Sequence, residues 1–172
     1  MLKTVPIIAV IVAALLLPSA INAKTNRNRI KHSAQVPAAT AGTFEAKIEG
    51  LMRQSGYDFR KVKQNSWYLI LPGREMPQIR IILGAGPSQI AMGAVVLTKR
   101  DVPMNAQAFH ELLKLSYSLN YVHVCIDADE DLIVMSQKKD PWLDVEEFKT
   151  TVSQVAAAAD RAFAVMKPYL SR

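Results

Sequence analysis

The chain has 172 residues, which suits one globular domain with appended segments, and its apolar content of 50% is too high for an intrinsically disordered chain. The formal net charge of +6 is unevenly distributed, because residues 43–172 hold 16 basic and 15 acidic side chains. A nearly neutral domain lacks the basic face that nucleic acids require, so we expect no nucleic-acid partner.

The first 23 residues have the organisation of a secretory signal peptide. Lys3 forms the basic region, an apolar run extends from Val5 to Leu17, and small residues lead to Ala23, after which we predict cleavage. Cleavage would leave an exported domain, periplasmic or secreted. Four basic residues follow, and they favour cytoplasmic retention, so an uncleaved membrane tether is the alternative: Lys24, Arg27, Arg29 and Lys31.

Residues 24–42 show no apolar period and are expected to form a flexible basic arm and linker. Two interpretations of this arm are open. It is either a solvated spacer, or a weak attachment of its basic residues to an anionic membrane surface or an acidic envelope polymer.

The domain is expected to occupy residues 43–172 and to begin with a helix that Thr43 caps and Gly56 ends. Short apolar runs separated by turn-forming residues then predict up to four strands that form an antiparallel meander. These strands are expected at about residues 57–62, 67–71, 79–83 and 90–97.

Three further elements follow the meander. A helix with one apolar stripe is predicted to begin behind a cap at Asn105, and a β-hairpin with an acidic turn is predicted from Val122 to Met135. Asp144 and Glu147 have the spacing of a capping box and predict the start of a long closing helix. The order α, three or four β, α, β, β, α predicts an α+β domain whose helices pack on one face of an antiparallel sheet.

A sheet covered on one face has a second face that solvent or a partner can reach. Five residues of the predicted strands alternate so that some of them should lie on that face, and they are our candidate partner-binding residues: Trp67, Tyr68, Ile79, Ile81 and Val95. If Trp67 lines this surface, its replacement by alanine should abolish binding and leave the stability of the fold nearly unchanged.

Three sequence patterns resemble ligand-binding motifs but are incomplete. Gly84-x-Gly86 lies between predicted strands and opens no helix, so a tight turn is expected. The pair His110-Glu111 is followed by Lys114 where a zinc-protease helix needs its second histidine.

The acidic turn Asp127, Asp129 and Asp131 has the spacing of a calcium loop, but Leu132 and Lys138 stand where the loop needs glycine and glutamate. We therefore expect no metal and no cofactor.

A single cysteine, Cys125, precludes an intrachain disulfide. His123 lies two residues before it on the same predicted strand, so the two side chains share a face and a nucleophile and base are one interpretation. No third residue can be placed to orient them. A structural histidine and a small core cysteine are therefore preferred, and a hydrolase is the third of the functions considered.

Several segments resemble the second half of the bacterial type III secretion chaperone-like superfamily, and most of all its sensory transduction regulator family. They are the leucine-rich helix 112–120, the acidic hairpin 122–135, the helix start 143–149 and the four alanines 156–159 followed by Asp160. The resemblance covers about residues 43–170 and implies an α+β sandwich-like domain that often dimerises and binds other polypeptides without turnover. The export signal departs from it, because secretion chaperones act in the cytoplasm.

The leading hypothesis is an exported, non-enzymatic domain that holds an extended polypeptide partner, and that forms a homodimer if it follows the superfamily. The alternative is a protein that binds a small ligand or an envelope polymer in a pocket between the sheet and the helices.

Overall fold

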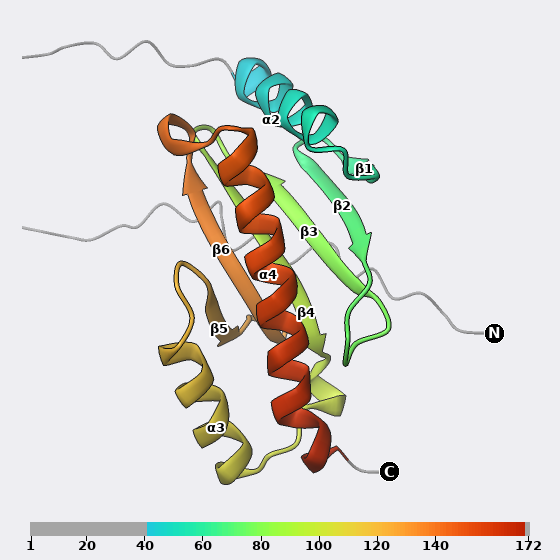
Figure 1. Cartoon of the computed structure of the whole chain (residues 1–172), viewed down its shortest axis with the longest axis vertical. Helices are drawn as coiled ribbons and strands as arrows, with labels where there is room; N and C mark the ends of the chain where they lie inside the picture. The colour runs from blue at the N-terminus through green and yellow to red at the C-terminus, as the bar shows by residue number, and fades with distance from the viewer. Residues whose placement is uncertain (1–40, 171–172) are drawn as a thin grey trace, which may run out of the picture.

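Six antiparallel strands form one sheet with the order β1-β2-β3-β4-β6-β5 in the computed structural model, which describes residues 41–170 (Figure 1). The predicted α+β class is confirmed, with four strands in the meander and two in the later hairpin. The strands are β1 (Phe59–Lys63), β2 (Ser66–Leu71), β3 (Ile79–Ala85), β4 (Gln89–Leu97), β5 (His123–Ile126) and β6 (Leu132–Lys139). The segments predicted as signal peptide and basic arm lie outside the described residues, apart from the last two positions of the arm.

The helices pack on one face of this sheet. Helix α4 (Val145–Met166) crosses β4, β6 and β3, and it is flanked by α2 (Ala41–Ser55) and α3 (Ala106–Tyr117) (Figure 1). Thr43 lies inside α2 and does not cap it. The described part of the chain also contains three short 3-10 helices: η2 (Lys99–Asp101), η3 (Asp140–Trp142) and η4 (Lys167–Tyr169). Within residues 41–170, none of the helices combines the length and apolar content that a bilayer crossing demands.

The two predicted helix caps are present. The Asn105 side chain accepts a hydrogen bond of 3.0 Å from the amide of Ala108, and the Asp144 side chain accepts one of 2.8 Å from the amide of Glu147. Each cap satisfies a first-turn amide that has no partner within its helix. The starts of α3 and α4 are therefore encoded locally.

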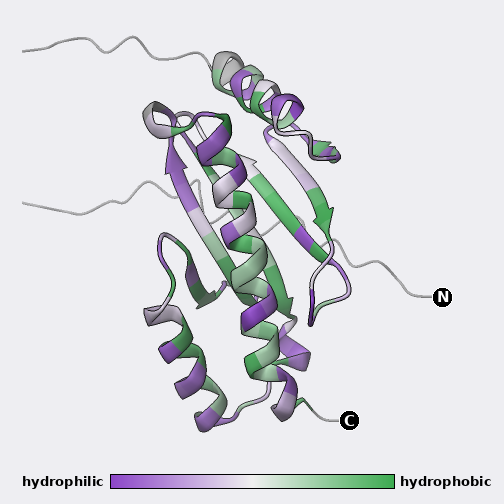
Figure 2. Ribbon diagram, in the orientation of Figure 1, coloured by the Kyte–Doolittle hydropathy of each residue, from purple (hydrophilic) through white to green (hydrophobic). Residues whose placement is uncertain are grey.

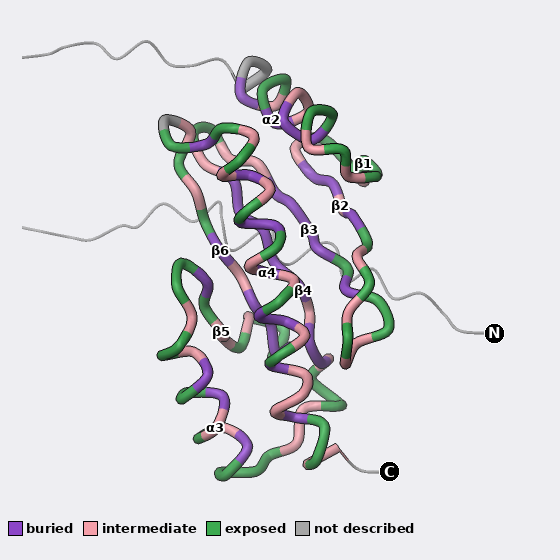
Figure 3. Tube along the Cα trace, in the orientation of Figure 1, coloured by how far each residue is buried: buried purple, intermediate pink, exposed green. Residues whose placement is uncertain are grey.

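The hydrophobic core lies between the helices and one face of the sheet. Central strands β3 and β4 are strongly hydrophobic, whereas the end of β6 is hydrophilic (Figure 2). The central strands are also the most buried part of the sheet, and the side of α4 that faces them is buried (Figure 3). Phe148, Val152 and Val155 of α4 are each 0% exposed and belong to this core. Helix packing on the sheet thus fixes which face is the inside.

Three of the five candidate partner-binding residues lie in the core and not on the second face. Trp67, Ile79 and Ile81 are at most 2% exposed and pack in the helix-side cluster. Alternation along a strand divides its residues into two sets but does not say which set the helices cover. Of the five candidates, Tyr68 and Val95 are the two that lie on the second face.

Candidate functional site

Strand β6 is twice as long as the strand that pairs with its outer edge. The eight residues of β6 pair with β4 along their whole length, whereas β5 has four residues and pairs only with Leu132–Met135. Among the described residues, no strand lies beside Gln137, Lys138 or Lys139 on the side away from β4 (Figure 1). We call this backbone segment the open edge.

Two backbone hydrogen bonds show how the open edge is oriented. Asp140 donates to the carbonyl of Ser88 at 2.8 Å, toward β4, and the Gln89 carbonyl accepts from Gly86 at 2.7 Å, away from β6. Because backbone groups of successive strand residues point to opposite edges, the amides and carbonyls of Gln137 and Lys139 point away from β4. Within residues 41–170 they have no hydrogen-bond partner on that side.

The chain before β5 turns away from β6 at Tyr121. This residue has φ of 62°, which is uncommon for a residue other than glycine. Its carbonyl accepts a 2.6 Å hydrogen bond from the Ser136 hydroxyl, and the next residue, Val122, is buried in the core. The bend therefore ends the β5 ladder beside Ser136 and leaves the rest of β6 without a neighbour.

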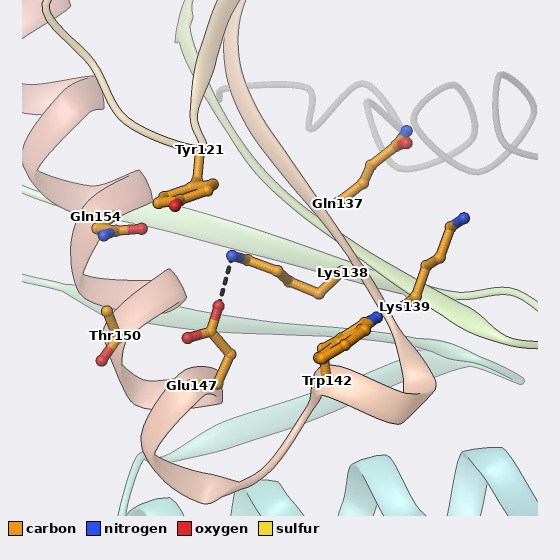
Figure 4. A pocket seen from close by; sticks show the side chains of 8 residues that line it. All are labelled: Tyr121, Gln137, Lys138, Lys139, Trp142, Glu147, Thr150 and Gln154. Carbon is orange, nitrogen blue, oxygen red and sulfur yellow. Dashed lines mark ion pairs between the residues drawn. The ribbon is translucent and has the colours of Figure 1, made fainter.

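A cavity of about 620 Å³ lies beside the open edge, between β6 and the first half of α4. We call it the edge pocket (Figure 4). Its lining consists of Tyr121, Lys138, Trp142, Glu147, Thr150 and Gln154, with Gln137 and Lys139 at its margin. A second cavity of about 380 Å³ shares Tyr121, Gln137 and Lys138 and continues past His123 and Met135. Hollows thus adjoin the open edge on both faces of the sheet.

Lys138 is the central charge of the edge pocket. Its ammonium lies 2.5 Å from the Glu147 carboxylate and 4.6 Å from the centre of the Tyr121 ring, and its side chain is only 14% exposed. Figure 4 shows this side chain directed toward Glu147, whereas Gln137 and Lys139 point away from the pocket. Lys138 is therefore held in place by an ion pair and a cation–π contact.

The α4 wall of the pocket is a polar stripe. Glu147, Thr150 and Gln154 lie three and four residues apart and so share one side of the helix. The side-chain oxygen of Gln154 is buried without a hydrogen-bond partner among residues 41–170. Across the pocket Trp142 is 75% exposed, and Tyr121 is 73% exposed. The pocket thus offers two accessible rings and a buried acceptor.

Tyr68 and Val95 are not part of this site. The guanidinium of Arg80 lies over the ring of Tyr68, 5.3 Å from the centre of that ring. Tyr68 is on β2, where it pairs with Ile82 of β3, and both β3 and β4 lie between β2 and β6. Val95 pairs with Ile133, before the open edge begins. The five sequence candidates therefore do not converge on one surface, and the partner-binding assignment of these two residues stays a prediction.

Sequence reasoning missed the residues that do converge. The predicted hairpin ended at Met135, because Ser136–Lys139 is polar and gives no strand signal, yet β4 pairs with it to the end. One residue could have indicated a binding surface from the sequence: Trp142, a large aromatic residue just before the capping box of α4.

Two of the sequence motifs lie on β5 and in the turn that follows it. His123 and Cys125 share one face of the sheet, as predicted, but it is the second face, so the expectation of a core cysteine is wrong and Cys125 is only partly buried. Burial and then Asp127 raise the pKa of the Cys125 thiol, which disfavours a thiolate nucleophile. The Asp127 side chain accepts hydrogen bonds from the amides of Asp129 and Asp131 and so closes its own turn. Among residues 41–170, no group of three or more histidine, cysteine or acidic side chains is arranged to hold a metal.

Comparison with known proteins gives a fold and no sequence relative. No family model matches the chain, and no curated protein matches it. Among solved structures, the heterodimeric ExoU-SpcU complex from the type III secretion system of Pseudomonas aeruginosa matches with a TM-score of 0.54 and 14% identity, over 70% of this chain and 98% of that chain.

Two further structures match at the same level. The ExsC-ExsE complex gives a TM-score of 0.51 and 12% identity over 76% of this chain and 96% of that chain. YbjN from E. coli gives 0.50 and 12%, over 74% and 95%. Identities this low establish shared architecture only. The resemblance to the type III secretion chaperone-like superfamily is thus confirmed at the level of the fold.

Proposed function

We propose that this protein is a non-enzymatic polypeptide-binding protein that adds an extended segment of its partner to the sheet at the open edge of β6. The observation that carries the proposal is the pair of outward-facing, unpartnered backbone units at Gln137 and Lys139. An unpaired strand edge is a template for another chain, and peptide recognition by strand addition uses it.

The energetics favour this mode of binding at modest affinity. A strand antiparallel to β6 would form two hydrogen bonds each with Gln137 and Lys139, and each such bond contributes about 0.5–1.5 kcal/mol net. Additional affinity must come from side chains that enter the two adjoining cavities. The affinity of the site is therefore expected to depend on the sequence of the bound segment.

The opposite edge of the sheet is also charged. Strand β1 carries Arg60, Lys61 and Lys63, and Lys61 binds both Glu45 and Glu49 of α2 at 2.8 and 2.9 Å. The open edge carries Lys138 and Lys139, so charge does not distinguish the two edges. We choose the open edge of β6 because two cavities that can take partner side chains adjoin it.

The fold comparison supports the same conclusion. Two of the matched structures, ExoU-SpcU and ExsC-ExsE, are complexes of two different polypeptides. Their architecture is thus compatible with holding a second chain, and we extend that capacity to this protein.

Strand addition is tested with peptides blocked by backbone N-methylation. A five-residue peptide of alternating threonine and valine should bind weakly, and methylation of the second or fourth amide should abolish binding because these amides face β6. Methylation of the third amide should have little effect. Equal effects at all three positions would show that the backbone ladder is not used.

The matching change in the protein is Gln137→Pro, which removes one amide from the open edge while leaving the β4 ladder intact. Gln137→Thr alters the side chain, keeps the amide and serves as the control. Sedimentation of the free protein identifies the competing outcome, in which the edges of two copies pair with each other.

A further inference from the structure

We propose that the second face of the sheet binds the apolar run at residues 5–17 of this same chain for as long as residues 1–23 remain attached. This inference goes beyond strand addition and is independent of it, because it concerns the flat of the sheet and not its open edge. It rests on the burial of the second face, on the small residues at its centre, and on the chain that precedes Ala41.

The centre of the second face is buried, although the helices of residues 41–170 pack on the opposite face (Figure 1). Ile82 of β3 and Ile133 of β6 alternate with core residues and so point to the second face. Each is nevertheless only 4% exposed, and neither belongs to the helix-side core. Something other than these helices therefore shields the two side chains.

Neighbouring side chains on the same face do not account for this burial. Ile82 has Tyr68 beside it on β2, but on β4 it pairs with Gly93, which has no side chain to cover it. Ser66 pairs with Gly84 and is 0% exposed, and its hydroxyl is buried without a hydrogen-bond partner among residues 41–170. On an open sheet face such a hydroxyl would be hydrated. Water is thus excluded from the centre of this face.

The rim of the second face is exposed, in contrast to its centre. Ile70 is 44% exposed, and Arg80, Gln137 and Lys139 are exposed as well. A buried centre within an exposed rim is the footprint of one narrow apolar element. Because the centre is buried within a single copy of the chain, the occupant we assign to it belongs to the same chain.

Three small residues lie side by side across the buried centre. Ser66 of β2 pairs with Gly84 of β3, and Gly84 pairs with Ala91 of β4, which is 1% exposed. We call these three residues the small-residue row, and Gln137 of β6 stands at its end. Small side chains let another element approach the strands closely. From β2 to β6 the row crosses about 14 Å, since neighbouring strands lie about 4.8 Å apart.

Residues 5–17 match the small-residue row in chemistry and length. None of their side chains is polar or charged. As a helix they would be about 20 Å long, enough to cross from β2 to β6. The intervening residues 18–40 can span up to about 76 Å when extended, which suffices to lead from α2 around the sheet to its second face. Docking there would keep the export segment out of water until it is removed.

Photocrosslinking tests which segment lies over the small-residue row. The full chain is made by cell-free translation without membranes, so that residues 1–23 stay attached. Gln137→Cys in a Cys125→Ser background places a benzophenone maleimide at the exposed end of the row. Lys114→Cys in the same background is the control, because its exposed side chain lies on α3 on the helix side. After irradiation and proteolysis, mass spectrometry should find residues 1–23 joined to position 137 and not to position 114.

A matched pair of charge substitutions tests whether the apolar run itself makes the contact. Ile11→Lys places an ammonium in the middle of the run and should lower the crosslink from position 137 about tenfold or more, because a buried unpaired charge is costly. Thr25→Lys adds the same charge outside the run and should leave the crosslink unchanged. Circular dichroism establishes that the labelled proteins are folded.

Three results would overturn the inference. Crosslinks between two copies would assign the second face to a dimer, and crosslinks from position 137 that never reach residues 1–23 would leave the run without a site there. Equal crosslinking from positions 137 and 114 would show that the run has no preferred site. Strand addition is judged separately by the peptide measurements and would stand in each case.

Discussion

The carboxylate of Asp160 lies 2.9 Å from the backbone nitrogen of Met76 and accepts its hydrogen bond, joining α4 to the loop between β2 and β3. The same carboxylate also accepts hydrogen bonds from the amides of Glu75 at 2.9 Å and Arg74 at 3.2 Å. Three successive amides of a loop that has no regular structure are thereby satisfied by one side chain. The loop backbone therefore surrounds the carboxylate of Asp160 with three amide donors.

The first prediction concerns pH. Burial alone would raise the pKa of Asp160, but the amides of Met76, Glu75 and Arg74 outweigh it and hold the pKa below its usual value. The stabilisation is therefore fully present above the ordinary aspartate pKa of about 4, and it is lost as pH falls through the lower pKa of the folded state.

Asp160→Asn should lower stability at pH 7 and flatten this acid-dependent loss. Urea unfolding of both proteins between about pH 2 and pH 7 measures the difference, which should shrink at the acid end. Curves that stay parallel throughout would contradict the assignment.

The second prediction concerns the close approach at Gly73. A Cβ atom there would lie 2.4 Å from the Met76 carbonyl oxygen and 2.6 Å from the Asp160 carboxylate. Gly73→Ala should therefore destabilise the protein by about 1–3 kcal/mol, because the loop must shift away from α4.

The matched control is Gly50→Ala in α2, where an added Cβ meets nothing within 4 Å. Alanine is the better helix former, so this variant should gain roughly 0.5–1 kcal/mol. Denaturant unfolding of the two variants should give shifts of opposite sign, and shifts of the same sign would contradict this assignment of the two glycines.

The third prediction revises the role of Trp67. Its side chain is 0% exposed within the helix-side core, so Trp67→Ala should cost about 3–5 kcal/mol of stability. Thermal melting measures this loss directly. Ile70→Ala is the control on the same strand, because Ile70 is 44% exposed and its truncation should cost much less. A nearly unchanged melting temperature for Trp67→Ala would restore the groove-lining interpretation.

The fourth prediction concerns export, which we propose from residues 1–23. Expression of the full chain in a bacterium should yield a mature protein that begins at Lys24 and fractionates outside the cytoplasm. Mass spectrometry of the intact protein and fractionation of the cells measure both properties. An intact Met1 terminus in the membrane fraction would indicate a tether.

A large part of the fold could be predicted from local patterns. The caps at Asn105 and Asp144 depend on residues three positions apart, and the hairpin depends on a period of two, so both are visible in short windows of sequence. The helix order and the antiparallel meander follow from these elements and short connections.

The candidate site could not be predicted in the same way, because it depends on a comparison between segments far apart in the chain. The polar stretch Ser136–Lys139 is a strand because the nine-residue β4 extends beside it, and its edge is open because β5 stops after four residues. The lengths of β4 and β5 are not encoded within residues 136–139.

The sequence by itself determined the α+β class, the element order and the two helix caps, because each depends on local periodicity or on side chains within one turn. Only the tertiary structure decided that Trp67, Ile79 and Ile81 face the helices, and that Tyr121, Lys138 and Gln154 meet beside an unpaired strand edge. The physical reason is that strand alternation defines two faces without choosing between them, and that an edge is open only relative to the neighbour that fails to reach it.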